Sequence, residues 1–202
     1  MKDKINKFKD VTFQVNNSKV TMDWLDPIYN EMLLSNKTGF YFNKGLHIYG
    51  LSESFDYDNL HYINSFLQKE YEMLFSNLYA FACDVFGNQF VFKEEKVYYF
   101  EIETSEVSLL ADNFKMWLEK VVNDCDYYFS PELVHEWQTN NRSLFHEERL
   151  TPRIPFILGG EYTISNLYAL DFFKAISFSA SIAKQVVNLP EGTDFKIIIS
   201  GK

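Results

Sequence analysis

The chain has 202 residues, of which 47% are hydrophobic and 23% charged, so it can bury a core and does not have the composition of a disordered protein. Its 28 acidic and 19 basic residues give a net charge of −9, which disfavours binding to nucleic acid or to an anionic membrane. The same charge favours a basic protein partner, although many soluble proteins are acidic simply because charge keeps them dispersed.

The two cysteines, Cys83 and Cys125, have neither metal-binding nor redox spacing. Cys83 lies in an apolar run and is expected to be buried, whereas the flanking aspartates should raise the pKa of Cys125. The first ten residues do not resemble a secretory signal, and no apolar run reaches transmembrane length. A cytoplasmic protein is therefore expected.

The N-terminal third predicts two strands and two helices. Residues 11–15 alternate like a strand and are followed by a turn at Asn16–Ser18. Asp26-Pro27 is typical of a helix start, with Asp as the cap and Pro at the first helical position. A short strand is predicted at 46–49, and Asp58 is expected to cap a second helix. The apolar residues of that helix recur at helical spacing: Leu60, Ile63, Leu67, Tyr71 and Leu74.

The centre of the chain carries the clearest pattern. Three runs rich in β-formers, at 78–84, 89–93 and 97–103, are joined by short turn-like links and predict an antiparallel meander. A helix is predicted next, with Ser108 as a possible cap. Its apolar residues fall on one face: Leu110, Phe114, Trp117, Leu118 and Val121.

The C-terminal part continues the alternation of helices and strands. Ser130-Pro131 predicts a helix start, and the polar stretch 139–153 is interpreted as a loop or weak helix. A strand at 166–170, a helix through Ile176–Val186, a turn at Pro190–Gly192 and a strand at 194–199 follow. Because no repeat or long linker divides the chain, we expect an α+β single domain with a largely antiparallel sheet and helices packed on it.

No catalytic, cofactor-binding or metal-binding constellation is evident. His135-Glu136 and His146-Glu147 each lack a second histidine four residues on, and Gly159-Gly160 lacks the spacing of a phosphate-binding loop. The pattern therefore favours a binding protein over an enzyme. A hydrolase or metal-dependent enzyme in which His135 and His146 converge stays an open alternative.

The meander and the helix after it resemble the SUKH superfamily, which includes the fungal cell-wall regulators related to Smi and Knr and many bacterial immunity proteins. FACDVFGNQFVF (81–92) matches the family's turn between two strands, and the run 97–121 matches its aromatic strand and "LA-x-(S/N)-F-x-x-(F/W)-L" helix. The matching residues are Phe81, Ala82, Asp84, Gly87, Asn88, Phe90, Tyr98, Tyr99, Leu110, Ala111, Asn113, Phe114, Trp117 and Leu118.

The resemblance extends over roughly residues 23–199, because the Asp26-Pro27 helix matches the family's opening helix and the C-terminal part is similar to an extension found in a bacterial subset. Residues 36–39 depart from the family pattern, and 124–153 has no matching motif. The resemblance implies one SUKH-like domain over residues 1–202, with 124–202 as a C-terminal extension of the core.

The resemblance also implies a function. The expected protein is an immunity protein that neutralises a cognate polymorphic or contact-delivered bacterial toxin by direct binding and occlusion of its active site. The toxin would be basic, of the nuclease or deaminase type. The alternative is a general protein-interaction or regulatory SUKH module without a toxin partner. The sequence leaves the oligomeric state open.

Two clusters of acidic and aromatic residues are candidate partner-binding sites. The first follows the Trp117 helix and consists of Asp124, Asp126, Tyr127, Tyr128 and Glu132. The second, beside the paired glycines, consists of Glu161 and Tyr162. Acidic and aromatic groups together suit an exposed contact with a basic protein. The competing interpretation of the first cluster is a helix end whose tyrosines turn inward.

Overall fold

A computed structural model describes residues 5, 7, 9–11 and 25–189. Its centre is a seven-stranded sheet whose strands lie side by side in chain order and pair antiparallel throughout. The strands are β1 (Lys9–Val11), β2 (Gly39–Tyr41), β3 (Leu46–Ile48), β4 (Tyr79–Asp84), β5 (Gln89–Lys93), β6 (Lys96–Phe100) and β7 (Val107–Ala111). The predicted meander is confirmed as β4–β6, and the α+β fold class is confirmed with it.

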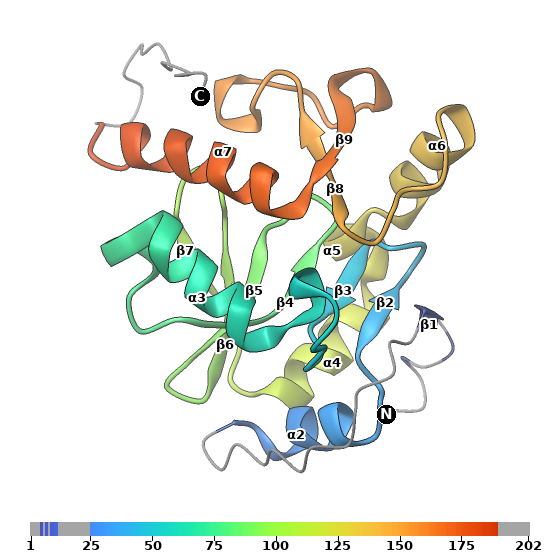
Figure 1. Cartoon of the computed structure of the whole chain (residues 1–202), viewed down its shortest axis with the longest axis vertical. Helices are drawn as coiled ribbons and strands as arrows, with labels where there is room; N and C mark the ends of the chain where they lie inside the picture. Colours follow the sequence, from blue (N-terminus) through green and yellow to red (C-terminus); the bar gives the residue numbers. More distant parts are fainter. Residues whose placement is uncertain (1–4, 6, 8, 12–24, 190–202) are drawn as a thin grey trace.

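Helices cover both faces of this sheet, as Figure 1 shows: α3 and α7 lie on one side, and α2 and α4 on the other. The helices are α2 (Pro27–Leu34), α3 (Leu60–Tyr71), α4 (Phe114–Asn123), α5 (Cys125–Phe129), α6 (Pro131–Asn140) and α7 (Phe172–Val186). A second, two-stranded antiparallel sheet pairs β8 (Glu148–Pro152) with β9 (Leu167–Asp171). The short 3-10 turns are η2 (Asp56–Asp58), η3 (Glu72–Phe75), η4 (Phe156–Leu158) and η5 (Ile164–Asn166).

Aromatic rings fill both sides of the central sheet. On the α4 side, the Phe81 and Phe90 rings of the meander lie 4.8 and 5.3 Å from the ring of Trp117. On the α3 side, Phe100 meets Tyr71 edge to face at 4.9 Å. All these rings are buried, so they form part of the hydrophobic core.

Helix caps explain where two helices begin. The Asp26 carboxylate accepts a hydrogen bond from the Ile28 amide at 2.8 Å, which confirms the predicted cap of α2. The prediction that Asp58 caps α3 is wrong: Asn59 does so, accepting from the Tyr62 amide at 3.0 Å. The Asp58 side chain is fully buried elsewhere, because it belongs to the network described below.

The helix predicted from Ser108 also begins later than expected. Residues 107–111 form β7, which pairs with β6, and α4 starts only after Asn113, whose side chain accepts from the Met116 amide at 2.9 Å. Strand pairing with β6 therefore overrides the helical spacing of Leu110, and the interpretation of Ser108 as a cap is wrong.

In the C-terminal part, α6, β9 and α7 confirm the predicted helices and strand. The interpretation of 139–153 as a loop or weak helix is wrong at its end, because Glu148–Pro152 pairs with β9 to form β8. Most of the predicted 11–15 strand, the Asn16–Ser18 turn, the Pro190–Gly192 turn and the 194–199 strand lie outside the described residues. Within the described part, no helix combines the length and apolarity that crossing a membrane requires.

Candidate functional site

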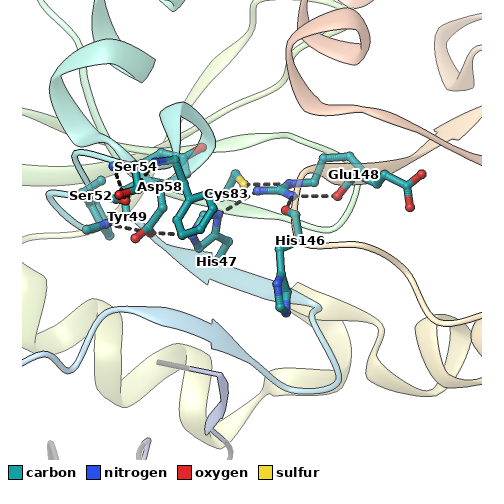
Figure 2. Close-up of polar contacts among 12 residues, drawn as sticks. His47, Tyr49, Ser52, Ser54, Asp58, Cys83, His146 and Glu148 are labelled. Carbon is teal, nitrogen blue, oxygen red and sulfur yellow. Dashed lines mark hydrogen bonds and ion pairs between the residues drawn. The ribbon is translucent and has the colours of Figure 1, made fainter. Parts of the chain in front are cut away.

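A buried polar network joins β8 to the central sheet, with His47 at its centre (Figure 2). The His47 Nε2 atom lies 2.9 Å from Asp58 Oδ1, and its Nδ1 atom lies 2.8 Å from Arg149 Nη2. Because a guanidinium group can only donate hydrogen bonds, His47 Nδ1 accepts one from Arg149, and the N–H of His47 Nε2 donates one to Asp58. Burial, and then the nearby Arg149 charge, hold the pKa of His47 well below its usual range, so the ring is neutral.

Arg149 is only 2% exposed, and every nitrogen of its guanidinium group donates a hydrogen bond. Its Nε atom donates to the Cys83 sulfur at 3.3 Å, and Nη1 donates to the carbonyls of His146 and Glu148 at 3.0 and 2.7 Å. The guanidinium also lies over two rings, 5.4 Å from the centre of Phe40 and 4.6 Å from that of Phe172. These contacts fix β8 against β3, β4 and α7.

Asp58 closes the other end of the network. Its Oδ1 atom also accepts from the Gly50 amide at 3.1 Å, whereas Oδ2 is buried without a hydrogen-bond partner among the described residues. Burial raises the pKa of Asp58 to about 7, although Gly50 and the charges of Arg149 and Lys9 act in the opposite direction. A Cβ at position 50 would lie 2.8 Å from Oδ2, so only glycine fits there.

The network contains the residue types of a cysteine-histidine catalytic site, but its geometry is not catalytic. The Cys83 sulfur accepts from Arg149, and both imidazole nitrogens are bonded to other residues. Burial raises the pKa of Cys83, and His47, Asp58 and Cys83 are each at most 1% exposed. A substrate would therefore meet no accessible nucleophile at these residues. The network holds two parts of the chain together.

His135 and His146, whose convergence in a metal site or hydrolase is the open alternative from the sequence, have different surroundings. His135 lies exposed on α6, whereas the His146 ring stacks against Phe40 at 5.2 Å. Within the described part of the chain, no group of three or more His, Cys, Asp and Glu side chains could hold a metal ion.

The first predicted cluster lies on consecutive elements at the surface. Asp124 lies between α4 and α5, Asp126, Tyr127 and Tyr128 lie on α5, and Glu132 is the second residue of α6. All except Tyr128 are exposed, and Tyr127 is 78% exposed. Tyr128 is half-buried against the core, so the alternative in which the tyrosines turn inward holds for Tyr128 alone.

An open groove of about 810 Å³ lies beside this cluster, between β1 and α6. Asp126 and Glu132 from the predicted cluster line it. The other lining residues converge from three separate stretches of the chain, so no local sequence pattern predicts them. They are Lys7, Lys9, Asp10, Phe42, Asn43, Cys125, Pro131, His135 and Glu136. Burial, and then the Asp126 carboxylate, raise the pKa of Cys125 in the expected direction.

The second predicted cluster lies on the connection between β8 and β9. Glu161 and Tyr162 are exposed, and Tyr162 is 61% exposed. The Tyr162 ring stacks almost parallel on Phe156 at 3.9 Å. Burial and the charges of nearby carboxylates raise the pKa of Tyr162 to about 12, so its hydroxyl keeps its proton at neutral pH.

The turn between β4 and β5 is stabilised by its own side chains. The Asp84 carboxylate accepts from the amides of Phe86 and Asn88 at 2.9 and 3.0 Å and from the Tyr99 hydroxyl at 2.8 Å. Gly87 has a positive φ of 95°, which favours glycine.

This turn and the strands and helices around it, residues 24–120, match the model of the SMI1/KNR4 family (SUKH-1).

Residues 24–120 belong to the SUKH superfamily. The structure is also similar to the crystal structure of Atu4351 from Agrobacterium tumefaciens, with a TM-score of 0.52 and 14% sequence identity over 77% of this chain and 75% of that one. At this identity the likeness shows a shared fold. A search of curated proteins returned no significant match.

The matched SUKH segment runs from α2 to α4, so α5, α6, α7, β8 and β9 follow it in the chain. Arg149 comes from the later part and contacts His47 and Cys83 inside the SUKH segment. Both predicted binding clusters also lie beyond residue 120. The SUKH segment is thus the platform, and the elements after it carry the candidate binding surface.

Proposed function

We propose that this SUKH protein neutralises a cognate bacterial toxin by binding it directly and occluding its active site. The observation that carries the proposal is the exposed face of α5 and α6, which projects from a SUKH platform. Between Lys120 and Arg142 the chain contains Asp124, Asp126, Glu132 and Glu136 but neither Lys nor Arg. Such an acidic face is complementary to a basic partner.

Electrostatics support a basic toxin of the nuclease or deaminase type. An enzyme that acts on nucleic acid needs positive charge around its active site, because its substrate carries a phosphate on every nucleotide. A protein of net charge −9 would be attracted to that cleft, and complementary fields increase the rate of encounter. Tyr127, at 78% exposure, adds a large ring that binding can bury.

The proposed mechanism requires no bond-making by the SUKH protein itself. The network of His47, Asp58, Cys83 and Arg149 is buried and serves to connect β8 with β3. Inhibition would instead come from covering the toxin's active site and from replacing its substrate's negative charge. The protein would act in the cytoplasm of the cell that makes it, where an incoming toxin must be stopped.

The proposal is tested by co-expression. Toxin domains of the nuclease or deaminase type, starting with any encoded beside this gene, are expressed in a bacterial host with and without the SUKH protein. One toxin should be tolerated only when the SUKH protein is present, and the two should co-purify as a stable complex. Several unrelated housekeeping partners and no toxin rescue would instead support a regulatory SUKH module.

A further inference from the structure

Strand β7 forms one edge of the central sheet, and its outer side is exposed. It pairs with β6, no other described strand pairs with it, and β1 forms the opposite edge (Figure 1). Val107 is 36% exposed and Leu109 is 53% exposed, and Ser108 between them is also exposed. Native proteins commonly protect such an edge with lysine, proline or a covering element. Residues 107–109 contain neither lysine nor proline.

The pairing with β6 shows which backbone groups of β7 point outward. The Glu101 amide donates to the Glu106 carbonyl at 3.0 Å. The next pair in this register is Phe100 with Val107. Residues along an antiparallel pair alternate between bonding to the neighbouring strand and facing away from it. The N–H and C=O groups of Val107 and Leu109 therefore face outward, and no described backbone group outside β6 bonds to them.

The free part of this edge is short. Beyond Leu109 the pairing with β6 shifts by one residue, which leaves Leu110 as an irregularity in the strand. The Lys120 amine donates to the Leu110 carbonyl at 3.1 Å. Irregularities of this kind commonly end strand pairing. The outward groups available to a further strand are thus those of Val107 and Leu109.

The segment Val107-Ser108-Leu109 is complementary to itself in an antiparallel pair. With a two-fold axis at Ser108, Val107 of each copy faces Leu109 of the other copy. Both of these residues have outward N–H and C=O groups, so each of the two Val107–Leu109 pairs would form two hydrogen bonds. Each pair also brings two exposed apolar side chains into contact, which stabilises strand pairing.

The charges near this edge are compatible with the same register. Glu106 would face Leu110 of the other copy rather than another acidic residue. Asp112, beyond the irregularity, has its Oδ1 atom 3.5 Å from the Lys96 amine of its own copy. The net charge of −9 on each copy opposes association, but salt screens this repulsion.

We propose that β7 pairs with β7 of a second copy of this chain, so that two seven-stranded sheets join edge to edge in a dimer. The outward backbone groups require an extended strand, and the self-complementary register selects a second copy as that strand. The groove between β1 and α6 lies at the opposite edge of the sheet and would stay accessible. The inference therefore goes beyond the proposed function and does not depend on it.

Analytical ultracentrifugation of the full chain measures this association. Dimers should form at concentrations of roughly 0.1 mM and above, because the paired segment is short. The dimer fraction should increase from about 50 to 500 mM salt, because screening weakens the repulsion between two acidic copies. This salt dependence is opposite in sign to that expected for binding of a basic partner.

The apolar pairs are tested by substitution of Leu109. Leu109→Lys should raise the dissociation constant about tenfold, because it removes both apolar pairs and introduces a residue that protects strand edges. Leu34→Lys, on α2 at 48% exposure, is the matched control and should change the constant by no more than about twofold. Each substitution adds one positive charge, from −9 to −8, so reduced repulsion cannot explain a weaker dimer.

The register is tested by disulfide crosslinking in a Cys125→Ser background, in which the remaining native cysteine is buried. Ser108→Cys would place two thiols at the axis, where facing Cα atoms are about 4.5 Å apart and a disulfide can form. Glu106→Cys, also exposed and on the same face of β7, would place its two thiols about 13 Å apart along the strand. Mild oxidation should link Ser108→Cys about tenfold faster.

Three results would overturn the inference: a chain that stays monomeric at every concentration and salt, equal dissociation constants for Leu109→Lys and Leu34→Lys, or equal crosslinking at positions 106 and 108. The substituted side chains are exposed, so the variants should keep their fold. None of these results bears on whether a toxin is neutralised, so the two proposals fail separately.

Discussion

Arg149 is the residue on which the attachment of the C-terminal elements most depends. Its planar group donates at three nitrogens to the Cys83 sulfur, the His47 ring and two carbonyls. Arg149 and Asp58 are hydrogen-bonded to the two different nitrogens of the neutral His47 ring. Arg149 therefore supplies a positive charge near the buried Asp58. No other type of side chain combines a fork of hydrogen-bond donors with a flat cationic group that can lie over the rings of Phe40 and Phe172.

Replacing this residue should therefore be costly. Arg149→Met should lower the free energy of unfolding by about 3 kcal/mol, because it leaves several buried acceptors unpaired and removes one of the two positive charges that act on Asp58. Urea denaturation measures the change. The double variant with Asp58→Asn should lose less than the sum of the two single variants, since the residues are coupled. A loss below about 1 kcal/mol, or strict additivity, would show that the network does not hold β8 in place.

Asp58 should make stability depend on pH. Its folded-state pKa, about 7, lies above its ordinary value of 3.8, so between these values the folded protein holds a proton that the unfolded chain has lost. Ionisation of Asp58 thus lowers the free energy of unfolding as the pH rises through this window. Asp58→Asn cannot ionise, so its stability relative to wild type should increase from pH 4 to pH 7 by on the order of 3 kcal/mol.

Paired urea titrations at pH 4.5 and pH 7.5 measure this difference, and contributions from other titrating groups cancel because both proteins share them. Glu53→Gln, at an exposed carboxylate, is the matched control. If the difference between Asp58→Asn and wild type is the same at both pH values, the burial of an ionisable Asp58 is contradicted.

At the scale of helices and strands, local sequence patterns were sufficient to predict an element wherever a helix cap or an alternating pattern had no competing interpretation. Asp26-Pro27 and the three aromatic strands are examples, because the cap, the proline and the period of two agree with the final structure. The prediction that Ser108 caps a helix was wrong because the sequence of Val107–Ala111 is compatible with a helix and with a strand. Only pairing with β6 decides between the two. Strand β8 was missed because its partner, β9, lies 15 or more residues later.

The candidate site was predictable only where its residues are close in sequence. The exposed cluster from Asp124 to Glu132 follows from a run without basic residues. The groove could not be foreseen, because it also needs Lys9 from β1 and Phe42 from the turn after β2. The network was hidden for the same reason: His47 and Arg149 are 102 residues apart, and a histidine inside an apolar strand was its only local sign.

The elements after residue 123 should be required for folding of the SUKH segment. Helix α7 packs on α3, and its Phe172 contacts both the Tyr49 ring and Arg149. A chain ending at Asn123 would expose this surface and leave His47 and Asp58 without Arg149. We expect it to unfold without a cooperative transition and to bind a hydrophobic dye, unlike the full chain. A cooperative transition of native-like midpoint in the shortened chain would show that 124–202 is dispensable for folding.

At the scale of the whole molecule, the net charge of −9 should control how fast the partner is found. The association rate with a basic toxin should fall by roughly tenfold or more between 50 and 500 mM salt, because salt screens the attraction between the two surfaces. The dissociation rate should change much less. Stopped-flow mixing measures both rates. An association rate that does not change with salt would show that surface charge does not guide the encounter.

Occlusion of the toxin's active site is tested most directly by a titration of the toxin's activity with the purified protein. Occlusion by binding predicts that residual nuclease or deaminase activity falls in a straight line and reaches its minimum at a fixed stoichiometric ratio, with full activity recovered after the complex is separated under denaturing conditions. Complete and lasting inactivation by a small fraction of an equivalent would instead reveal a catalytic action on the toxin and would contradict the account.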